Sequence, residues 1–353
     1  MKKLAVVISS LEVGGAERMV LDLVKQIKDK INVKLFVIKS NSHSIYDKEA
    51  SRLGVELIYF NHKIKILSLF VVFRFIKEMN RFKPDIIHSH LKASTYVYFY
   101  YLFNKQFKWI HTVHTLANID TKCIRRQFFK PLYNNNKLVI VAVSDKVKES
   151  IKRIYPKSDV VTIYNGINLE RFKSNNKNNT KEINLVSVGR LAKEKNHEYL
   201  LKELIGVRGL VDKVYLIGDG KERWKLEEII KQKALDSNVI MIKFTNRVIY
   251  YLANSKIYLC SSLYEGHPIS IIEAMASGLI VIASKAASEL ITNNYNGFII
   301  DLEKGELENK IAFVINNLDK LDYIKENAKK TVSCLSIENM ANSYLSLYIG
   351  DNQ

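Results

Sequence analysis

Two glutamates in one stretch bounded by a proline and a glycine are the most specific chemical feature of this sequence. Glu265 and Glu273 are separated by seven residues within the stretch 262–278. Pro268 suits the start of a helix and Gly278 its end, so Glu265 falls in the preceding loop and Glu273 about one turn into the helix. Carboxylates in these two places can accept hydrogen bonds from sugar hydroxyl groups at opposite ends of one ligand. An ordinary loop and helix with two glutamates is the alternative.

The turn between these glutamates supplies backbone donors. Its N–H groups can face the same ligand, because the first N–H groups of a helix have no partner inside the helix. The residues of this turn are Gly266, His267, Pro268, Ile269 and Ser270.

A basic loop forms the second candidate site. Residues 187–191 end a predicted strand, and Lys195 and Asn196 follow directly before a predicted helix. An arginine and a lysine in one loop at the carboxyl end of a strand, here Arg190 and Lys195, can grip a diphosphate. A solvated loop is the alternative, since lysine occurs throughout this chain.

Glycines mark two further strand ends. Gly14 and Gly15 follow the first predicted strand, and the helix after them can offer free N–H groups to an anion. This is not the dinucleotide-binding fingerprint, because the third glycine and its spacing are missing. Gly218 and Gly220 end another strand, where they suit a base or ribose lying across the backbone. Tight turns are the alternative at both places.

These candidates require elements that bring strand ends together. Short β-branched runs alternate with longer amphipathic stretches, such as 16–28 and 64–80, which is typical of parallel sheets covered by helices on both faces. The predicted strands are 4–9, 33–38, 55–60, 85–88, 109–113, 138–143 and 160–163, followed by 183–188, 214–217, 239–242, 257–260 and 280–283.

A polar segment divides this alternation into two halves. Residues 173–182 contain no apolar side chain, which predicts an exposed linker or loop. We therefore expect an α/β protein with two Rossmann-like, doubly wound domains, residues 1–170 and 181–335, facing across a cleft. A last helical segment, 336–353, can pack back toward the N-terminal domain.

The formal net charge of +18 fits an anionic partner, whether lipid, nucleic acid or a phosphorylated substrate. Lysine-rich composition bias is the alternative. No nucleic-acid-binding module is recognisable, so nucleic acid is not an expected partner. The stretch 63–83 alternates basic residues with large apolar ones, so it predicts either a helix on an anionic membrane surface or a core helix with a wet lysine face.

The sequence indicates a cytoplasmic protein. Its first apolar run ends at Ser9, too early for a signal peptide, and is interpreted as a buried strand. The longest apolar stretches, 66–73 and 93–103, fall short of the roughly 20 residues that span a bilayer. The three cysteines are far apart and form no disulfide framework, which points to a reducing compartment.

No metal site is expected. The histidines near two predicted strand ends have no cysteine or carboxylate at typical ligand spacing, and the chain has no Asp-x-Asp motif. These histidines are His88, His90, His111 and His114.

In the order and spacing of its motifs the chain resembles the retaining glycosyltransferases of the GT-B fold, family four. The resemblance spans nearly the whole chain. Its motifs are residues 14–18, 85–90, 112–114 and 165–168, Gly189-Arg190 with Lys195-Asn196, residues 218–220 and the paired glutamates.

This resemblance implies a role for each candidate. Arg190 and Lys195 match the positions that hold the donor diphosphate, Glu273 the glutamate that binds the ribose, and Glu265 the one beside the donor sugar. Gly15 matches the glycine loop near the donor phosphate and the acceptor. His114 matches a histidine that contacts the sugar and supports the reacting centre.

The resemblance also implies an activity. The N-terminal domain would bind the acceptor and the C-terminal domain a nucleotide-sugar donor, expected to be a UDP-sugar, with no other cofactor and no metal. With the positive charge, it suggests a glycan acceptor on a polyprenyl diphosphate. The enzyme would then lie peripherally on the inner face of the plasma membrane, in surface polysaccharide or O-antigen biosynthesis. A nucleotide-sugar epimerase of the same architecture and a non-catalytic sugar-nucleotide binding protein are the alternatives.

Some positions depart from the family pattern. Thr115 stands where an aspartate is common, and His267 where a bulky apolar residue is common. Ala286-Ala287 replaces a glycine pair before Glu289, and Leu279 replaces a proline. The departures at His267 and Ala287 concern the predicted sugar pocket, so they bear on sugar specificity and not on the fold.

Overall fold

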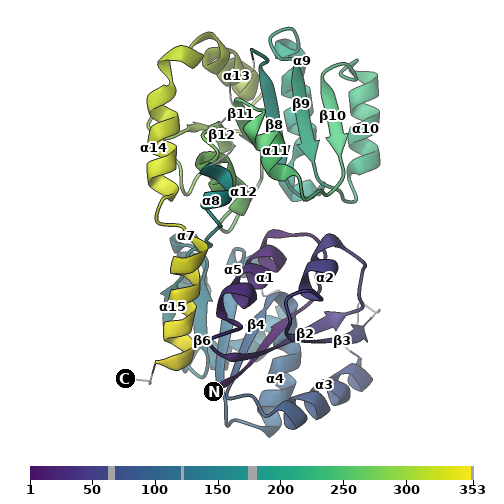
Figure 1. Ribbon diagram of the computed structural model, residues 1–353, viewed down its shortest axis with the longest axis vertical. Coiled ribbons are helices and arrows are strands. Elements are labelled where there is room, and N and C mark those ends of the chain that lie inside the picture. Colours follow the sequence, from purple (N-terminus) through teal and green to yellow (C-terminus); the bar gives the residue numbers. More distant parts are fainter. Residues whose placement is uncertain (63–67, 121–122, 174–180, 351–353) are drawn as a thin grey trace. The chain divides into compact units, whose positions relative to one another are not determined.

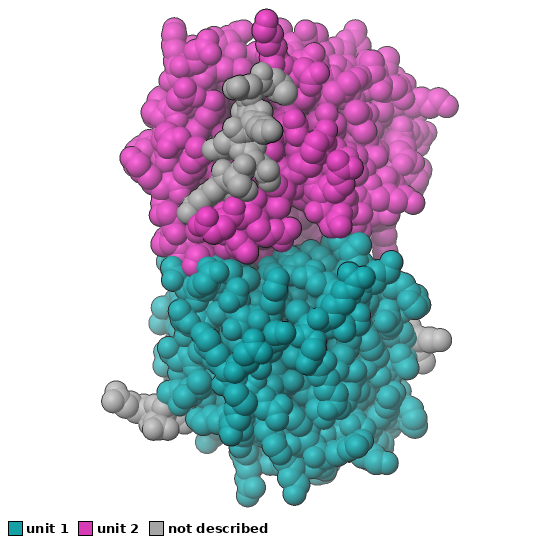
Figure 2. Space-filling view, viewed as in Figure 1, with its two compact units in different colours: residues 1–166, 337–353 teal, residues 167–336 magenta. Residues whose placement is uncertain are grey.

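The computed structural model describes residues 1–62, 68–120, 123–173 and 181–350. They form two compact units, residues 1–166 with 337–353 and residues 167–336, which Figure 2 colours separately. The predicted bounds were 1–170, 181–335 and 336–353. Residues 167–170 therefore lie with the second unit, and the C-terminal helix lies with the first. Most of the predicted linker, 174–180, falls outside the described residues.

Unit 1 is built on a seven-stranded parallel sheet of order β3-β2-β1-β4-β5-β6-β7 (Figure 1). Its strands are β1 (Lys3–Ile8), β2 (Asn32–Lys39), β3 (Glu56–His62), β4 (Ile86–His90), β5 (Lys108–Val113), β6 (Val139–Ala142) and β7 (Val160–Thr162). Its helices are α1 (Gly15–Ile27), α2 (Ile45–Ala50), α3 (Leu69–Phe82), α4 (Ser94–Phe103), α5 (Ala117–Asp120), α6 (Cys123–Asn134), α7 (Asp145–Ile154) and α15 (Ile337–Ile349).

Alternate residues of the central strands face different helices. Ile87 of β4 and Trp109 of β5 pack into a buried cluster with α3 and α4, to which Phe75 and Val97 belong. The neighbours of Ile87 and Trp109 along each strand point to the other face of the sheet, because successive side chains of a strand alternate between faces. The helix α15 packs against α1 within this unit.

Unit 2 contains a six-stranded parallel sheet of order β10-β9-β8-β11-β12-β13. Its strands are β8 (Asn184–Val188), β9 (Lys213–Ile217), β10 (Val239–Ile242), β11 (Ile257–Cys260), β12 (Ile280–Ser284) and β13 (Phe298–Ile300). Its helices are α8 (Glu170–Lys173), α9 (His197–Val207), α10 (Arg223–Gln232), α11 (Val248–Ala253), α12 (Ile269–Ala276), α13 (Glu306–Asn316) and α14 (Asp322–Val332).

The structure departs most from the predicted elements in two places. The strand β13, which pairs in parallel with β12, was not predicted. The predicted helix 64–80 begins later, at Leu69, and continues to Phe82. Residues 63–67 lie outside the described residues.

Each sheet has one switch point, where the chain order reverses beside the first strand. It lies between β1 and β4 in unit 1, and between β8 and β11 in unit 2. The carboxyl ends of parallel strands diverge there and leave a crevice that ligands commonly occupy in doubly wound sheets. The candidate residues are therefore expected at these two places.

Candidate active site

The loops after β8 and β11 meet at the switch point of unit 2. The Lys195 ammonium forms an ion pair with the Glu265 carboxylate, and the Ser262 hydroxyl donates a 2.7 Å hydrogen bond to the same carboxylate oxygen. The Lys195 and Glu265 side chains are only 19% and 14% exposed. Burial by itself lowers the pKa of Lys195, but the adjacent Glu265 carboxylate raises it above its ordinary value. This edge of the sheet therefore holds a lysine that stays charged and fixed in place.

Arg190, the second predicted cation, is held less firmly. Its side chain is 60% exposed, and its guanidinium lies 3.4 Å from the Glu194 carboxylate. An exposed ion pair of this kind contributes about 0–1 kcal/mol, so little free energy opposes its rearrangement. Arg190 can turn toward an anion that binds beside Lys195.

Side-chain and backbone hydrogen bonds join the two loops around Lys195. The Ser261 hydroxyl lies 3.0 Å from the carbonyl oxygens of both Lys195 and Asn196. The Leu263 N–H donates a 2.8 Å bond to the Glu194 carbonyl. The role of these serines as supports for Lys195 was not predicted from the sequence. The signal available was a pair of small polar residues directly after a buried strand.

The glycines after β9 allow two backbone segments to touch. A Cβ atom on Gly218 would lie 1.8 Å from the Gly189 carbonyl oxygen, and one on Gly220 would lie 2.4 Å from the Leu191 carbonyl oxygen. In return, the Leu191 N–H donates a 2.9 Å bond to the Asp219 carbonyl. The close contact between these two backbone segments of unit 2 thus explains why both positions are glycine. Their contact with a nucleotide stays a prediction.

The paired glutamates occupy the elements that the sequence predicted for them. Glu265 lies in the loop before α12, and Glu273 lies half-buried within the helix. Pro268 is the N-cap of α12, and Ile269 and Ser270 begin it. Buried apolar residues on α12, among them Ile272 and Met275, anchor the helix in the unit.

His267, one of the departures from the family pattern, is 4% exposed next to the buried Gly266. Burial lowers the pKa of His267 to about 4, so the ring is neutral near pH 7. A neutral imidazole carries no charge into this buried position, although it keeps one N–H donor and one acceptor nitrogen.

Two predicted site residues lie in unit 1. Gly15 is the exposed first residue of α1, after the Gly14 N-cap. His114 directly follows β5, and β4 ends beside it at His90. The His90 Nδ1 and His114 Nε2 atoms are 3.0 Å apart. The predicted residues therefore form two groups, and the larger one belongs to unit 2.

A buried polar network lies behind His90. His88 Nδ1 lies 2.6 Å from the Tyr348 hydroxyl, and His88 Nε2 lies 2.8 Å from the Thr112 hydroxyl. The Thr112 hydroxyl also lies 3.0 Å from that of Tyr344. The two tyrosines on α15 were not predicted from the sequence to take part in this network. Their spacing of four residues, which places both on one helix face, was the available signal.

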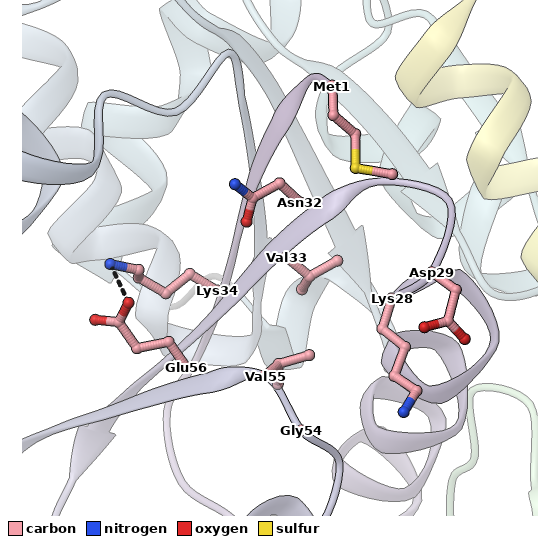
Figure 3. Close-up of a pocket in the computed structure, with 9 residues that line it drawn as sticks. All are labelled: Met1, Lys28, Asp29, Asn32, Val33, Lys34, Gly54, Val55 and Glu56. Atoms are coloured by element: carbon pink, nitrogen blue, oxygen red, sulfur yellow. Dashed lines mark ion pairs between the residues drawn. The ribbon is translucent and has the colours of Figure 1, made fainter.

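A shallow pocket lies elsewhere on unit 1, at the amino ends of β2 and β3 (Figure 3). The Lys34 ammonium and the Glu56 carboxylate form a 2.6 Å ion pair within it. Its other lining residues are Met1, Lys28, Asp29, Asn32, Val33, Gly54 and Val55. None of the predicted site residues is among them, and the pocket is at the opposite ends of the strands from the switch point.

Comparisons with known proteins assign the chain to a family. Residues 13–171 match Glycosyltransferase Family 4, and residues 168–331 match Glycosyl transferases group 1. The chain belongs to the GT-B glycosyltransferases of family four. The resemblance inferred from its motifs is confirmed, and the enzyme is a glycosyltransferase.

Relatives and solved structures agree with this family. The chain is 24% identical to N-acetylgalactosamine-N,N'-diacetylbacillosaminyl-diphospho-undecaprenol 4-alpha-N-acetylgalactosaminyltransferase of Campylobacter jejuni, with 94% of each chain covered. It is 28% identical to UDP-Gal:alpha-D-GlcNAc-diphosphoundecaprenol alpha-1,3-galactosyltransferase of Escherichia coli, with 68% of each covered. HepE of Anabaena, solved with UDP and glucose, is similar in structure with a TM-score of 0.86 and 19% identity, covering 99% of this chain and 100% of HepE.

The predicted GT-B fold is confirmed by this likeness and by the two parallel sheets. The epimerase alternative finds no support, because the relatives named above are transferases. Within the described ranges, no helix combines the length and apolar composition needed to cross a bilayer.

The four histidines of this glycosyltransferase do not converge on one point. His88 and His90 lie on the face of β4 that α15 covers, whereas the His111 ring lies beside Asp120, with 3.8 Å between Nε2 and the carboxylate. Among the residues that the structure describes, no group of three or more histidine, cysteine or acidic side chains is placed to hold a metal ion. Independence from metal stays a prediction about the reaction.

Because several of its histidines are buried and neutral, the enzyme is expected to lose stability in mild acid. Burial lowers the pKa of His88 and His90 well below the ordinary value, and that of His114 to about 3. Burial also lowers the pKa of His197 to about 4, as it does for His267. Unfolding restores pKa values near 6.5, so below that pH the unfolded chain binds protons that the folded chain does not.

We therefore expect the free energy of unfolding to fall as the pH drops from about 6.5 to about 5, by up to about 1.4 kcal/mol per histidine per pH unit. Unfolded carboxylates titrate mainly below this window, near pH ~4, so the histidines dominate the slope. Urea denaturation at several pH values measures the effect. A midpoint that stays constant across this window contradicts the prediction.

Proposed function

We propose that this glycosyltransferase moves a hexose or N-acetylhexosamine from a UDP-sugar to a lipid-linked glycan, with retention of anomeric configuration and without a metal. The observation that carries the proposal is the charged Lys195 held by Glu265 at the unit 2 switch point. The names of two relatives specify diphosphoundecaprenol-linked acceptors, and HepE was solved with UDP. Another relative, CapH of Staphylococcus aureus, is a capsular polysaccharide biosynthesis glycosyltransferase. We infer a role in surface polysaccharide or O-antigen biosynthesis.

The proposed reaction breaks the bond between the anomeric carbon and the donor phosphate oxygen. Negative charge develops on that oxygen, and a preorganised cation stabilises it most in the transition state. Lys195 supplies this cation, and Arg190 adds a second one when it turns inward. The acceptor hydroxyl attacks the face that the phosphate leaves, and its proton passes to the leaving phosphate oxygen.

The other predicted residues bind the donor. Glu273 accepts hydrogen bonds from the ribose hydroxyls, and the backbone N–H groups of residues 266, 267, 269 and 270 line the path between ribose and sugar. Glu265 has two tasks, because it holds Lys195 through one oxygen and can accept a sugar hydroxyl through the other. Gly15 and His114 of unit 1 contact the phosphate and the sugar in this scheme.

A product analysis tests the reaction. A panel of nucleotide sugars is first screened for slow hydrolysis to the nucleoside diphosphate, which identifies the donor without knowledge of the acceptor. We expect a UDP-sugar to be turned over. The product formed with a lipid-linked acceptor should then show the donor's anomeric geometry by NMR, and excess chelator should leave the rate unchanged. Inversion, or loss of the rate with chelator, overturns the proposal.

The proposed acceptor places the enzyme on the inner face of the plasma membrane. The helix α3 carries Leu69, Phe70 and Phe73 on its exposed side, and Phe70 is 76% exposed. Lys77 and Arg81 follow on the same outward face, on a helix at the periphery of unit 1 (Figure 1). Large apolar rings next to cations suit a surface of anionic lipid, where each basic residue contributes about 1 kcal/mol.

We expect the enzyme to co-sediment with anionic vesicles and to do so more weakly at moderate salt. Replacing both Phe70 and Phe73 by serine should weaken vesicle binding at least about tenfold, because each ring buried in lipid contributes roughly 1.5–3 kcal/mol. Trp224→Ser is the matched control, since Trp224 is 68% exposed but lies in unit 2. Equal binding to neutral and anionic vesicles, or none to either, contradicts the membrane prediction and leaves the charge as composition bias.

A further inference from the structure

His90 and His114 share one hydrogen bond whose direction can be assigned. The His90 Nδ1 and His114 Nε2 atoms are 3.0 Å apart, and the ring centroids are 5.3 Å apart. His90 is fully buried, whereas His114 is half-buried at the carboxyl edge of the sheet. His114 is therefore the ring that can meet a ligand, and His90 is the ring behind it.

Both rings are neutral, so one ring must donate the hydrogen bond and the other must accept it. Burial, with the other histidines nearby, lowers the pKa of His90 and His114 far below pH 7. A neutral imidazole has one N–H donor and one acceptor nitrogen. The 3.0 Å contact thus allows two arrangements, which differ in where the second proton lies.

The far nitrogen of His90 decides between them. Within the described part of the chain, His90 Nε2 is buried and has no hydrogen-bond partner. If His114 donated to His90 Nδ1, then His90 Nε2 would be protonated, and its buried N–H group would have no acceptor. A buried N–H without a partner is rarer and less favourable than an unused acceptor. His90 therefore donates through Nδ1, His114 accepts at Nε2, and the proton of His114 is on Nδ1.

The orientation of His90 is fixed from behind. Its ring centroid lies 4.0 Å from that of His88, and both nitrogens of His88 are bonded, to Tyr348 and to Thr112. Thr112 in turn contacts Tyr344, so two tyrosines of α15 hold His88 and Thr112 in place. The His90 ring therefore packs against a ring that is itself fixed, and turning it over would break its contact with His114.

We propose that His90 is a positioning residue that locks His114 as the Nδ1–H tautomer, so that His114 offers the bound sugar a hydrogen-bond donor and not a base. The proposal rests on the contact between His114 and the sugar in the proposed function. It fits a reaction in which the leaving phosphate takes the acceptor proton, because no histidine base is then required. The ligand atom that His114 recognises is an acceptor oxygen of the sugar.

The tautomer can be measured directly by long-range ¹H–¹⁵N correlation on ¹⁵N-histidine-labelled enzyme. Signals that vanish in His114→Ala identify the ring. We expect a protonated Nδ1 and an unprotonated Nε2 in the wild type. Replacing His90 by phenylalanine removes the donor at similar size and should release this preference. Replacing it by asparagine places an amide donor near the lost Nδ1 and should restore it.

Activity provides the second measurement. We expect His90→Phe to lower kcat at least about tenfold with little change in KM, and His90→Asn to recover most of the loss. An Nε2–H tautomer in the wild type, or an unchanged tautomer in His90→Phe, overturns the inference. Full activity of His114→Ala overturns the role given to His114. If the wild type turned over no nucleotide sugar, the proposed function would fail while the tautomer result would still stand.

Discussion

Lys195→Ala is expected to lower turnover about 100- to 1000-fold, the loss typical of removing one group that stabilises transition-state charge, about 2.7–4 kcal/mol. The reason lies in the geometry at the unit 2 switch point. Glu265 holds the Lys195 ammonium in place and raises its pKa against the effect of burial. A cation already positioned before the bond breaks needs no reorganisation when charge develops on the leaving phosphate.

The same substitution should affect folding less than turnover. It leaves the Glu265 carboxylate with the Ser262 hydroxyl as a donor, so the stability loss is about 1–3 kcal/mol. Lys193→Ala is the matched control, because Lys193 is exposed and belongs to the same short turn, Lys193–Lys195. Turnover is measured with the donor found in the nucleotide-sugar screen, and folding by thermal denaturation. Near-normal turnover of Lys195→Ala would remove Lys195 from the proposed mechanism.

Gly218→Ala is expected to destabilise unit 2 by about 3 kcal/mol or more. The added Cβ would lie 1.8 Å from the Gly189 carbonyl oxygen, and φ of Gly218 is +154°, which L residues rarely adopt. The clash involves backbone on both sides, so no side-chain rotation relieves it. The loops after β8 and β9 would have to separate, and the loop after β8 carries Arg190 and Lys195.

Thermal denaturation checks this prediction. At roughly 2–4 °C per kcal/mol for a unit of this size, Tm should fall by about 6 °C or more. Gly209→Ala is the matched control, since a Cβ there meets no atom within 4 Å. Its Tm should stay within about 2 °C of the wild type. Equal Tm values for the two variants would contradict the close contact seen between the loops.

Local sequence pattern was sufficient for most of the elements and for the list of candidate residues. Continuous apolar runs such as 257–260 and 280–283 form strands buried on both faces, and this pattern is visible without knowledge of their neighbours. The proline and glycine around α12 likewise predicted where Glu265 and Glu273 would lie, because both residues act on the backbone locally. The strand β13 was missed, and its pairing with β12 is what identifies these residues as a strand.

The tertiary structure decided which of these residues meet. Lys195 and Glu265 are 70 residues apart, and they pair because β8 and β11 are neighbours in the sheet. The contact of Tyr348 with His88 spans 260 residues and requires the C-terminal helix to return to unit 1. Pairings of this kind depend on strand order and helix docking, which are set by burial of apolar surface over the whole unit. The sequence alone therefore determined the elements and their chemistry, while partners, protonation and the direction of the His90–His114 bond depended on the fold.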